Sequence, residues 1–139
     1  MIEGLSAELL TPQCNAQGRW LKLWPEVASR ADNRFSLSIA YPGAVTAWLS
    51  PQTPCRLICL QGMIQLAVFD SRRKAASFAT LEEYFIGEHH LLGLTLPAGL
   101  HFGWKVLSAG EAWLLSDAAP LLETPPDLPA DTDLIPYQW

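Results

Sequence analysis

Charged residues are few in this sequence, and basic ones are outnumbered. Lys and Arg total 9 against 14 Asp and Glu, which gives a formal net charge of −5 over 139 residues. A protein that binds nucleic acid or an anionic membrane surface needs a basic patch to offset phosphate charge. The composition therefore argues against both partners and favours a small molecule or another protein.

Long apolar runs and paired cysteines are also missing. No segment approaches the roughly 18 consecutive apolar residues of a membrane-spanning helix, and residues 1–10 lack the basic segment of a secretory signal. The three cysteines, Cys14, Cys55 and Cys59, form no CxxC pair. That usage fits a reducing compartment better than a disulfide framework, so we expect a cytoplasmic protein.

Apolar residues, in contrast, make up 50% of the chain and include six tryptophans. This supply excludes disorder across the whole chain, and 139 residues suit one globular domain, residues 1–139. Short apolar runs, each ended by Gly, Pro, Asp or Ser, predict an all-β fold. The runs lie at 19–24, 35–41, 44–49, 56–60, 63–69, 81–86, 91–96, 104–107 and 112–115.

Three segments carry more detailed predictions. In 35–41, Phe35, Leu37, Ile39 and Tyr41 alternate with small residues, which predicts that these four form the buried face of a strand. Residues 26–34 are polar and indicate a loop or a single helical turn. Residues 118–139 begin rich in proline and acids and end in DLIPYQW. We expect an extended, irregular arm that docks back on the barrel.

The glycine spacing of two segments matches the motifs that hold the metal ion in cupin barrels. Gly43 and Gly62 bound the first motif, and Pro97 and Gly99 begin the second. The four ligand positions of this frame hold Leu49, Pro51, Cys55 and Phe102. A bound ion needs three or four N or O ligands around one point. The sequence therefore predicts a cupin frame with no metal site and no cofactor.

Six segments, in order over nearly the whole chain, carry a more specific likeness. They are MIEG at 1–4, YPGAV at 41–45, LQGMIQLAVFDSR at 60–72, GEHH at 87–90, PAGLHFGWKVLS at 97–108 and DLIPYQW at 133–139. Together they resemble the dTDP-4-dehydrorhamnose 3,5-epimerase family, metal-independent cupins of nucleotide-sugar metabolism. The resemblance implies a double-stranded β-helix jelly roll, a nucleotide-sugar ligand, and a homodimer in which N-terminal strands pair across the interface.

The catalytic pattern of that family is missing from this chain. The family removes a proton beside a ketone with a histidine base and returns one to the opposite ring face with the help of a tyrosine. The segment that matches the base, Val45 to Leu49, has no histidine, and the tyrosine position falls on Leu115. The diphosphate-holding segment is Asn15 to Gly18, with Arg19 displaced by one residue. We therefore expect a divergent member without 3,5-epimerase activity.

The motif frame predicts that Leu49, Phe102 and Leu115 face an apolar barrel interior. As a binding hypothesis, an aromatic set with one cation could stack a nucleobase or sugar and pair with its phosphate. The ligand-binding candidates are Trp48, Arg56, Phe102 and Trp104. The alternative, which we favour for the tryptophans, is that they pack the core or a dimer interface.

Two functions remain open. The first is a non-catalytic cupin that binds a sugar nucleotide, or a partner enzyme, in carbohydrate biosynthesis. The second is an active sugar-nucleotide isomerase or epimerase with relocated catalytic groups, for which His101, Tyr84 and Glu83 are the candidates. The two differ in whether these side chains point into the cavity.

The expected strands and turns indicate where several polar residues lie. Neighbours on a strand face opposite sides, so His101, next to Phe102, is expected at the rim or surface. His89 and His90 are expected in a solvated hairpin turn. The cluster of Asp70, Arg72 and Arg73 predicts a solvated turn with local ion pairing that contributes little. No Ser/His/Asp set has a spacing that indicates more than chance.

Overall fold

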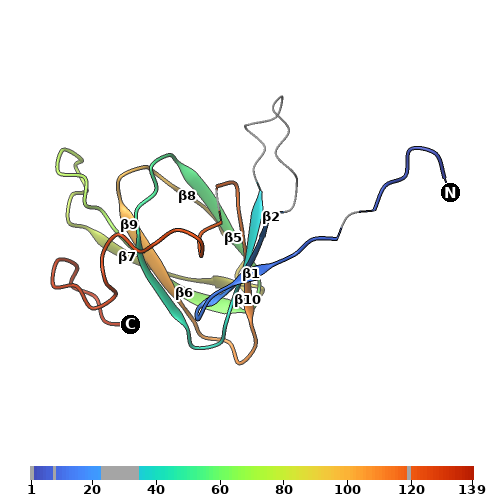
Figure 1. Cartoon of the computed structure of the whole chain (residues 1–139). Helices are drawn as coiled ribbons and strands as arrows, with labels where there is room; N and C mark the ends of the chain where they lie inside the picture. Colours follow the sequence, from blue (N-terminus) through green and yellow to red (C-terminus); the bar gives the residue numbers. More distant parts are fainter. Residues whose placement is uncertain (1, 8, 23–34, 119) are drawn as a thin grey trace.

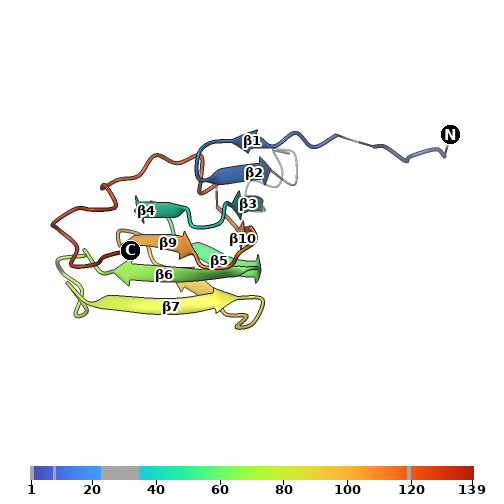
Figure 2. The ribbon, with the colours of Figure 1, turned by 90° about the horizontal axis from the view of Figure 1, so that it is seen from below.

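The computed structural model describes residues 2–7, 9–22, 35–118 and 120–139, and the loop predicted at 26–34 lies outside them. The described part is all-β, as predicted, with ten strands in two antiparallel sheets. The six-stranded sheet has the order β1-β2-β3-β10-β5-β8, and the four-stranded sheet the order β4-β9-β6-β7. Figures 1 and 2 show the two sheets facing each other around one core, with the N-terminal segment reaching away from them.

All nine predicted apolar runs coincide with strands. The strands are β1 Gln13–Cys14, β2 Gly18–Lys22, β3 Ser36–Ala40, β4 Val45–Leu49, β5 Cys55–Gln61, β6 Met63–Phe69, β7 Leu81–Gly87, β8 Gly93–Leu96, β9 His101–Val106 and β10 Ala112–Ser116. The run predicted at 19–24 is described only as far as residue 22. The GEHH segment is a turn, as predicted, in which the His89 side chain is 80% exposed.

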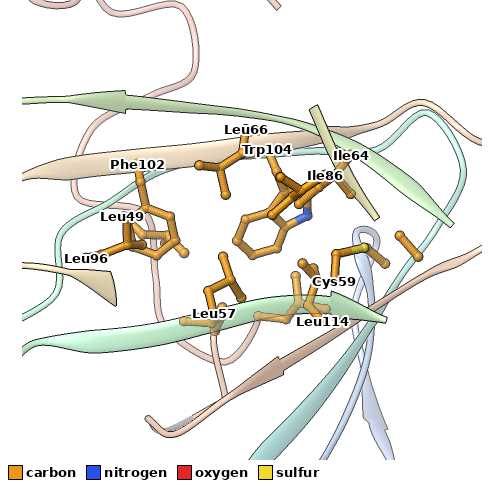
Figure 3. Close-up of a cluster of buried hydrophobic side chains, with 14 of the residues drawn as sticks. Leu49, Leu57, Cys59, Ile64, Leu66, Ile86, Leu96, Phe102, Trp104 and Leu114 are labelled. Atoms are coloured by element: carbon orange, nitrogen blue, oxygen red, sulfur yellow. The ribbon is translucent and has the colours of Figure 1, made fainter. Parts of the chain in front are cut away.

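The core between the sheets is built by alternation along each strand. On β9, Phe102, Trp104 and Val106 are buried in the main cluster, so the residues that alternate with them, His101 and Lys105, point to the outer side of the sheet. The prediction that His101 turns away from the barrel interior is therefore confirmed. Figure 3 shows Trp104 at the centre of this cluster.

The predicted faces of two strands in the six-stranded sheet are wrong, although Ile39 of the face predicted for β3 is buried, at 6% exposed. On β3 the inward face carries Ser36, Ser38 and Ala40, which are at most 2% exposed, because Ser38 pairs with Leu114. Small side chains here leave room for the neighbouring Trp20, which pairs with Ser38 from the other side. On β10 it is Leu114, not Leu115, that joins the core, because Leu114 pairs with the inward-facing Ser38 of β3 and Cys59 of β5.

The C-terminal arm lies against both sheets in its described part, residues 118 and 120–139. Leu121 and Leu122 join the main core. Farther along, Ile135 is buried against Trp48 on the outer side of the four-stranded sheet. Two backbone hydrogen bonds of 2.8 Å hold the arm against β4. The Asp127 amide donates to the Trp48 carbonyl, and the Trp48 amide donates to the carbonyl of residue 128. In Figures 1 and 2 the arm is the orange-red trace that ends beside the four-stranded sheet.

No helix in the described ranges is long and apolar enough to cross a membrane.

Candidate functional site

Hydrocarbon fills the centre of the barrel where cupins hold their ligands. Leu49, Cys55 and Phe102, three of the four ligand positions of the motif frame, are 3%, 1% and 1% exposed and face the core. Leu49 and Phe102 lie together at one end of the cluster in Figure 3. Pro51 lies in the loop after β4, where its carbonyl accepts a hydrogen bond from Gly99. Across the described residues, no group of three His, Cys, Asp or Glu is placed to hold a metal ion.

The two cysteines of β5 also point into this core. Burial raises the pKa of both Cys55 and Cys59 to about 11. A thiol with such a pKa stays protonated near neutral pH, and the thiolate is the nucleophile and metal ligand. These two side chains therefore act as small apolar residues.

A polar pocket lies at the edge of the barrel, between the edge strands β7 and β8. Its volume is about 240 Å³, or roughly eight water molecules at about 30 Å³ each, which suits a single sugar ring. Leucines form its apolar floor, while carboxylates, hydroxyls, a phenol and a guanidinium form its walls. We call it the β7–β8 pocket; its polar lining is Asp70, Arg72, Ser77, Thr80, Glu82, Tyr84 and Thr95.

Asp70 anchors one wall of the β7–β8 pocket. It is only 6% exposed and accepts hydrogen bonds of 3.0, 2.9 and 2.9 Å from the backbone amide, Nε and Nη2 of Arg72, and a further one from Ser77. The Arg72 side chain, followed by Ser77, holds the pKa of Asp70 well below its usual range against the effect of burial. The prediction of a solvated turn is thus wrong for Asp70, because residues 71–80 fold back over it.

Tyr84 and Glu82 are the residues that β7 contributes to the pocket. Both lie on the inner face of β7, and the Tyr84 hydroxyl donates a 2.6 Å hydrogen bond to Glu82 Oε2. This bond and the carboxylate charge raise the pKa of Tyr84. The site therefore presents a protonated phenol beside a carboxylate, which can serve as an acid and a base or hold the hydroxyl groups of a sugar.

The other two catalytic candidates lie outside the pocket. Glu83, which alternates with Glu82, points to the outer side of β7 and accepts a 2.7 Å bond from the Tyr137 hydroxyl of the arm. His101 is bound on the outer side as well, with Nε2 2.6 Å from Asp127 Oδ2 and Nδ1 2.5 Å from Ser71 Oγ. Of the three candidates, only Tyr84 reaches the pocket.

Ser71, His101 and Asp127 form a hydrogen-bonded chain that was not predicted from the sequence. Their spacings of 30 and 26 residues follow only from the fold of the arm over β9. Ser71 Oγ also lies 3.2 Å from the Gly99 carbonyl. A carboxylate can only accept, so His101 Nε2 donates to Asp127 and this contact fastens the arm to the sheet.

The four ligand-binding candidates do not meet in one place. Trp104 and Phe102 stack in the core with ring centroids 6.3 Å apart. Trp48 lies on the opposite side of the four-stranded sheet, under Tyr137 and Trp139 of the arm. Arg56 is exposed on β5, near Thr95. None of the four lines the β7–β8 pocket, and ligand binding by this set stays a prediction.

Similarity to known proteins agrees with this architecture. No model of a known protein family matches the chain. The Haloferax volcanii protein named "Probable low-salt glycan biosynthesis epimerase Agl13" is 30% identical over 82 residues, which cover 57% of this chain and 52% of that protein. The chain thus aligns with about half the length of this curated relative.

Three solved structures share the fold. A dTDP sugar isomerase from Desulfovibrio desulfuricans G20 is 20% identical with a TM-score of 0.67, over 99% of this chain and 92% of that one. The capsular polysaccharide assembling protein CapF from Staphylococcus aureus has a TM-score of 0.63 at 12% identity, over 79% and 28%. The Drosophila melanogaster CENP-C cupin domain has a TM-score of 0.61 at 7% identity, over 77% and 73%. The chain has the cupin fold, as the motif frame predicted.

Proposed function

We propose that this protein is a divergent cupin of the dTDP-4-dehydrorhamnose 3,5-epimerase type that binds a sugar nucleotide in the cytoplasm, for carbohydrate biosynthesis, without epimerising it. The observation that carries the proposal is the filled barrel centre beside the small polar β7–β8 pocket. Leu49 and Phe102 leave no base at the centre, while the pocket offers hydroxyls, carboxylates and a phenol to a sugar. The names of the Haloferax and Desulfovibrio proteins support the substrate class.

Saturation-transfer NMR against dTDP-sugars, dTDP and free hexoses tests this proposal. We expect transfer from the protein to the sugar protons. In Tyr84→Phe the affinity should fall about tenfold, because one hydrogen bond worth roughly 1.4 kcal/mol is lost. Tyr41→Phe, just after β3 and outside the pocket lining, is the matched control and should bind as the native protein does. Absence of transfer to every sugar nucleotide would refute the proposal.

The Tyr84–Glu82 pair favours a second function, a sugar-nucleotide isomerase. Glu82 would take the proton from the hydroxyl-bearing carbon beside the ketone while the Tyr84 hydroxyl gives its proton to the carbonyl oxygen, which forms an enediol. Glu82 would then return its proton to the former carbonyl carbon as the hydroxyl proton of the neighbouring oxygen passes back to Tyr84, which leaves the ketone displaced by one carbon. Both groups act from one side, whereas inversion needs delivery to the opposite ring face. Incubation of a dTDP-4-keto sugar in D₂O separates the two functions. A product with its carbonyl on the neighbouring carbon and deuterium at the former carbonyl carbon, lost in Glu82→Gln, establishes the isomerase, and no uptake leaves the binding function.

A homodimer through the N-terminal strands is also part of the proposal. The N-terminal segment exposes Ile2, Leu5 and Leu9 at 72%, 64% and 90%. The outer face of the six-stranded sheet exposes Leu60 on β5 and Trp113 on β10 at 47% and 37%. Exposed apolar side chains of this kind are typical of surfaces that pair with a second chain.

The dimer is tested by size-exclusion chromatography with light scattering. We expect the native chain to elute with twice its monomer mass. Trp113→Glu places a charge on the paired face and should shift the protein to monomer. Phe85→Glu changes an aromatic side chain that is 47% exposed on the other sheet and should leave the dimer intact. A native monomer at all concentrations contradicts this part of the proposal.

A further inference from the structure

A second cavity lies where the end of the C-terminal arm meets Val45, the first residue of β4. Its volume is about 690 Å³, and every lining residue except Val45 belongs to the arm. It is distinct from the β7–β8 pocket, with which it shares no lining residue. We call it the arm cavity; its polar and aromatic lining is Asp131, Thr132, Asp133, Tyr137, Gln138 and Trp139.

The two aromatic rings of the arm cavity are fixed by their own contacts. The Tyr137 hydroxyl donates to Glu83 at 2.7 Å and accepts a hydrogen bond from Gln65. The Trp139 ring lies 4.7 Å from Tyr137 and 5.1 Å from the buried Trp48, measured between ring centroids. Because the rings are already ordered, a ligand that packs against them has little side-chain entropy to offset.

The charge of the arm cavity limits the kind of ligand that it can bind. Asp131 and Asp133 contribute two exposed carboxylates, and none of the lining residues is basic. An acidic ligand would meet like charge without a partner, whereas hydroxyl or amino groups can donate to these carboxylates and to the Gln138 amide. The cavity volume falls in the range of about 300–1,000 Å³ that is typical of ligand sites. It is larger than the volume that one sugar ring fills.

We propose that the arm cavity binds a short oligosaccharide without acidic groups. The apolar face of a sugar ring packs against Tyr137 and Trp139, and its hydroxyl groups donate to Asp131 and Asp133. Rigid aromatic rings beside convergent polar groups are the general make-up of a small-molecule site. This second site is independent of the sugar nucleotide proposed for the β7–β8 pocket.

Saturation-transfer NMR and tryptophan fluorescence test the proposal with cellobiose, deacetylated chitobiose, digalacturonate and a lysine-rich peptide. We expect cellobiose and chitobiose to bind, and digalacturonate to bind at least tenfold more weakly. The double variant Asp131→Ala/Asp133→Ala removes two acceptors and should weaken binding at least tenfold. Both residues are exposed, so the thermal midpoint should stay unchanged.

Two control variants locate the binding. Glu123→Ala removes an exposed carboxylate of the arm outside the cavity and should bind cellobiose as the native protein does. Tyr84→Phe changes only the β7–β8 pocket and should also leave cellobiose binding unchanged. The proposal is overturned if neither neutral nor amino sugar binds, if digalacturonate binds as tightly, if the double variant binds normally, or if only the peptide binds.

Discussion

Replacing Trp104 with alanine is expected to lower the free energy of unfolding by about 4 kcal/mol. Trp104 is fully buried at the centre of the main core, stacked on Phe102. Removing the indole leaves a cavity that the surrounding strands of two sheets can close only in part. Urea unfolding followed by far-UV circular dichroism measures the change without relying on tryptophan fluorescence. Phe85→Ala, at a 47% exposed ring, is the control and should cost less than about 1 kcal/mol.

A conservative variant at the same position decides between a packing role and a binding role. Trp104→Phe keeps most of the buried volume and removes an indole N–H for which the described residues offer no hydrogen-bond partner. We expect the free energy of unfolding to fall by less than about 1.5 kcal/mol and the affinity for sugar nucleotides to stay unchanged. Lost affinity at unchanged stability would instead place Trp104 in the binding site, as the aromatic hypothesis from the sequence had it.

The strands were predictable because their signal is local. Alternation with period two, ended by glycine or proline, identifies a strand whatever it packs against. The glycine frame from Gly43 to Gly62 likewise reported the barrel, although its ligand positions hold Leu49, Pro51 and Cys55. The fold could therefore be predicted from short-range sequence patterns alone.

Which face of a strand turns inward was harder, because alternation separates the faces without orienting them. On β3 the buried face is the small one, Ser36, Ser38 and Ala40, since bulk is supplied by neighbours such as Trp20. On β10 the pairing with Ser38 of β3 places Leu114, rather than Leu115, in the core. Both outcomes depend on partners distant in the sequence.

The polar sites depend on such partners even more. On β7, strand alternation places Glu82 and Glu83 on opposite sides of the sheet. The sequence does not indicate, however, that Glu82 and Tyr84 line one pocket together with Asp70. The contact between His101 and Asp127 requires the arm to cross β4 and β9. Of the candidate residues, Tyr84 alone was both named from the sequence and placed in the β7–β8 pocket.

Asp70→Asn is expected to lower the free energy of unfolding by about 2 kcal/mol at pH 7, the order of a charged hydrogen-bond set lost from a buried group. An amide presents one acceptor oxygen where the carboxylate presents two. It therefore cannot reproduce both the paired contacts from Arg72 and the bond from Ser77. Chemical unfolding at pH 7 measures this loss.

The same variant should also change the response to acid. The pKa of Asp70 is lowered in the folded protein, so its ionised form stabilises the fold at all pH above the unfolded value of about 3.9, and this stabilisation is lost as the pH falls below it. The native protein should lose stability more steeply than Asp70→Asn below about pH 4. Asp133→Asn, at an exposed carboxylate, should keep the native acid response. Parallel curves for native protein and Asp70→Asn would contradict the role of Asp70 as the charged anchor of the pocket wall.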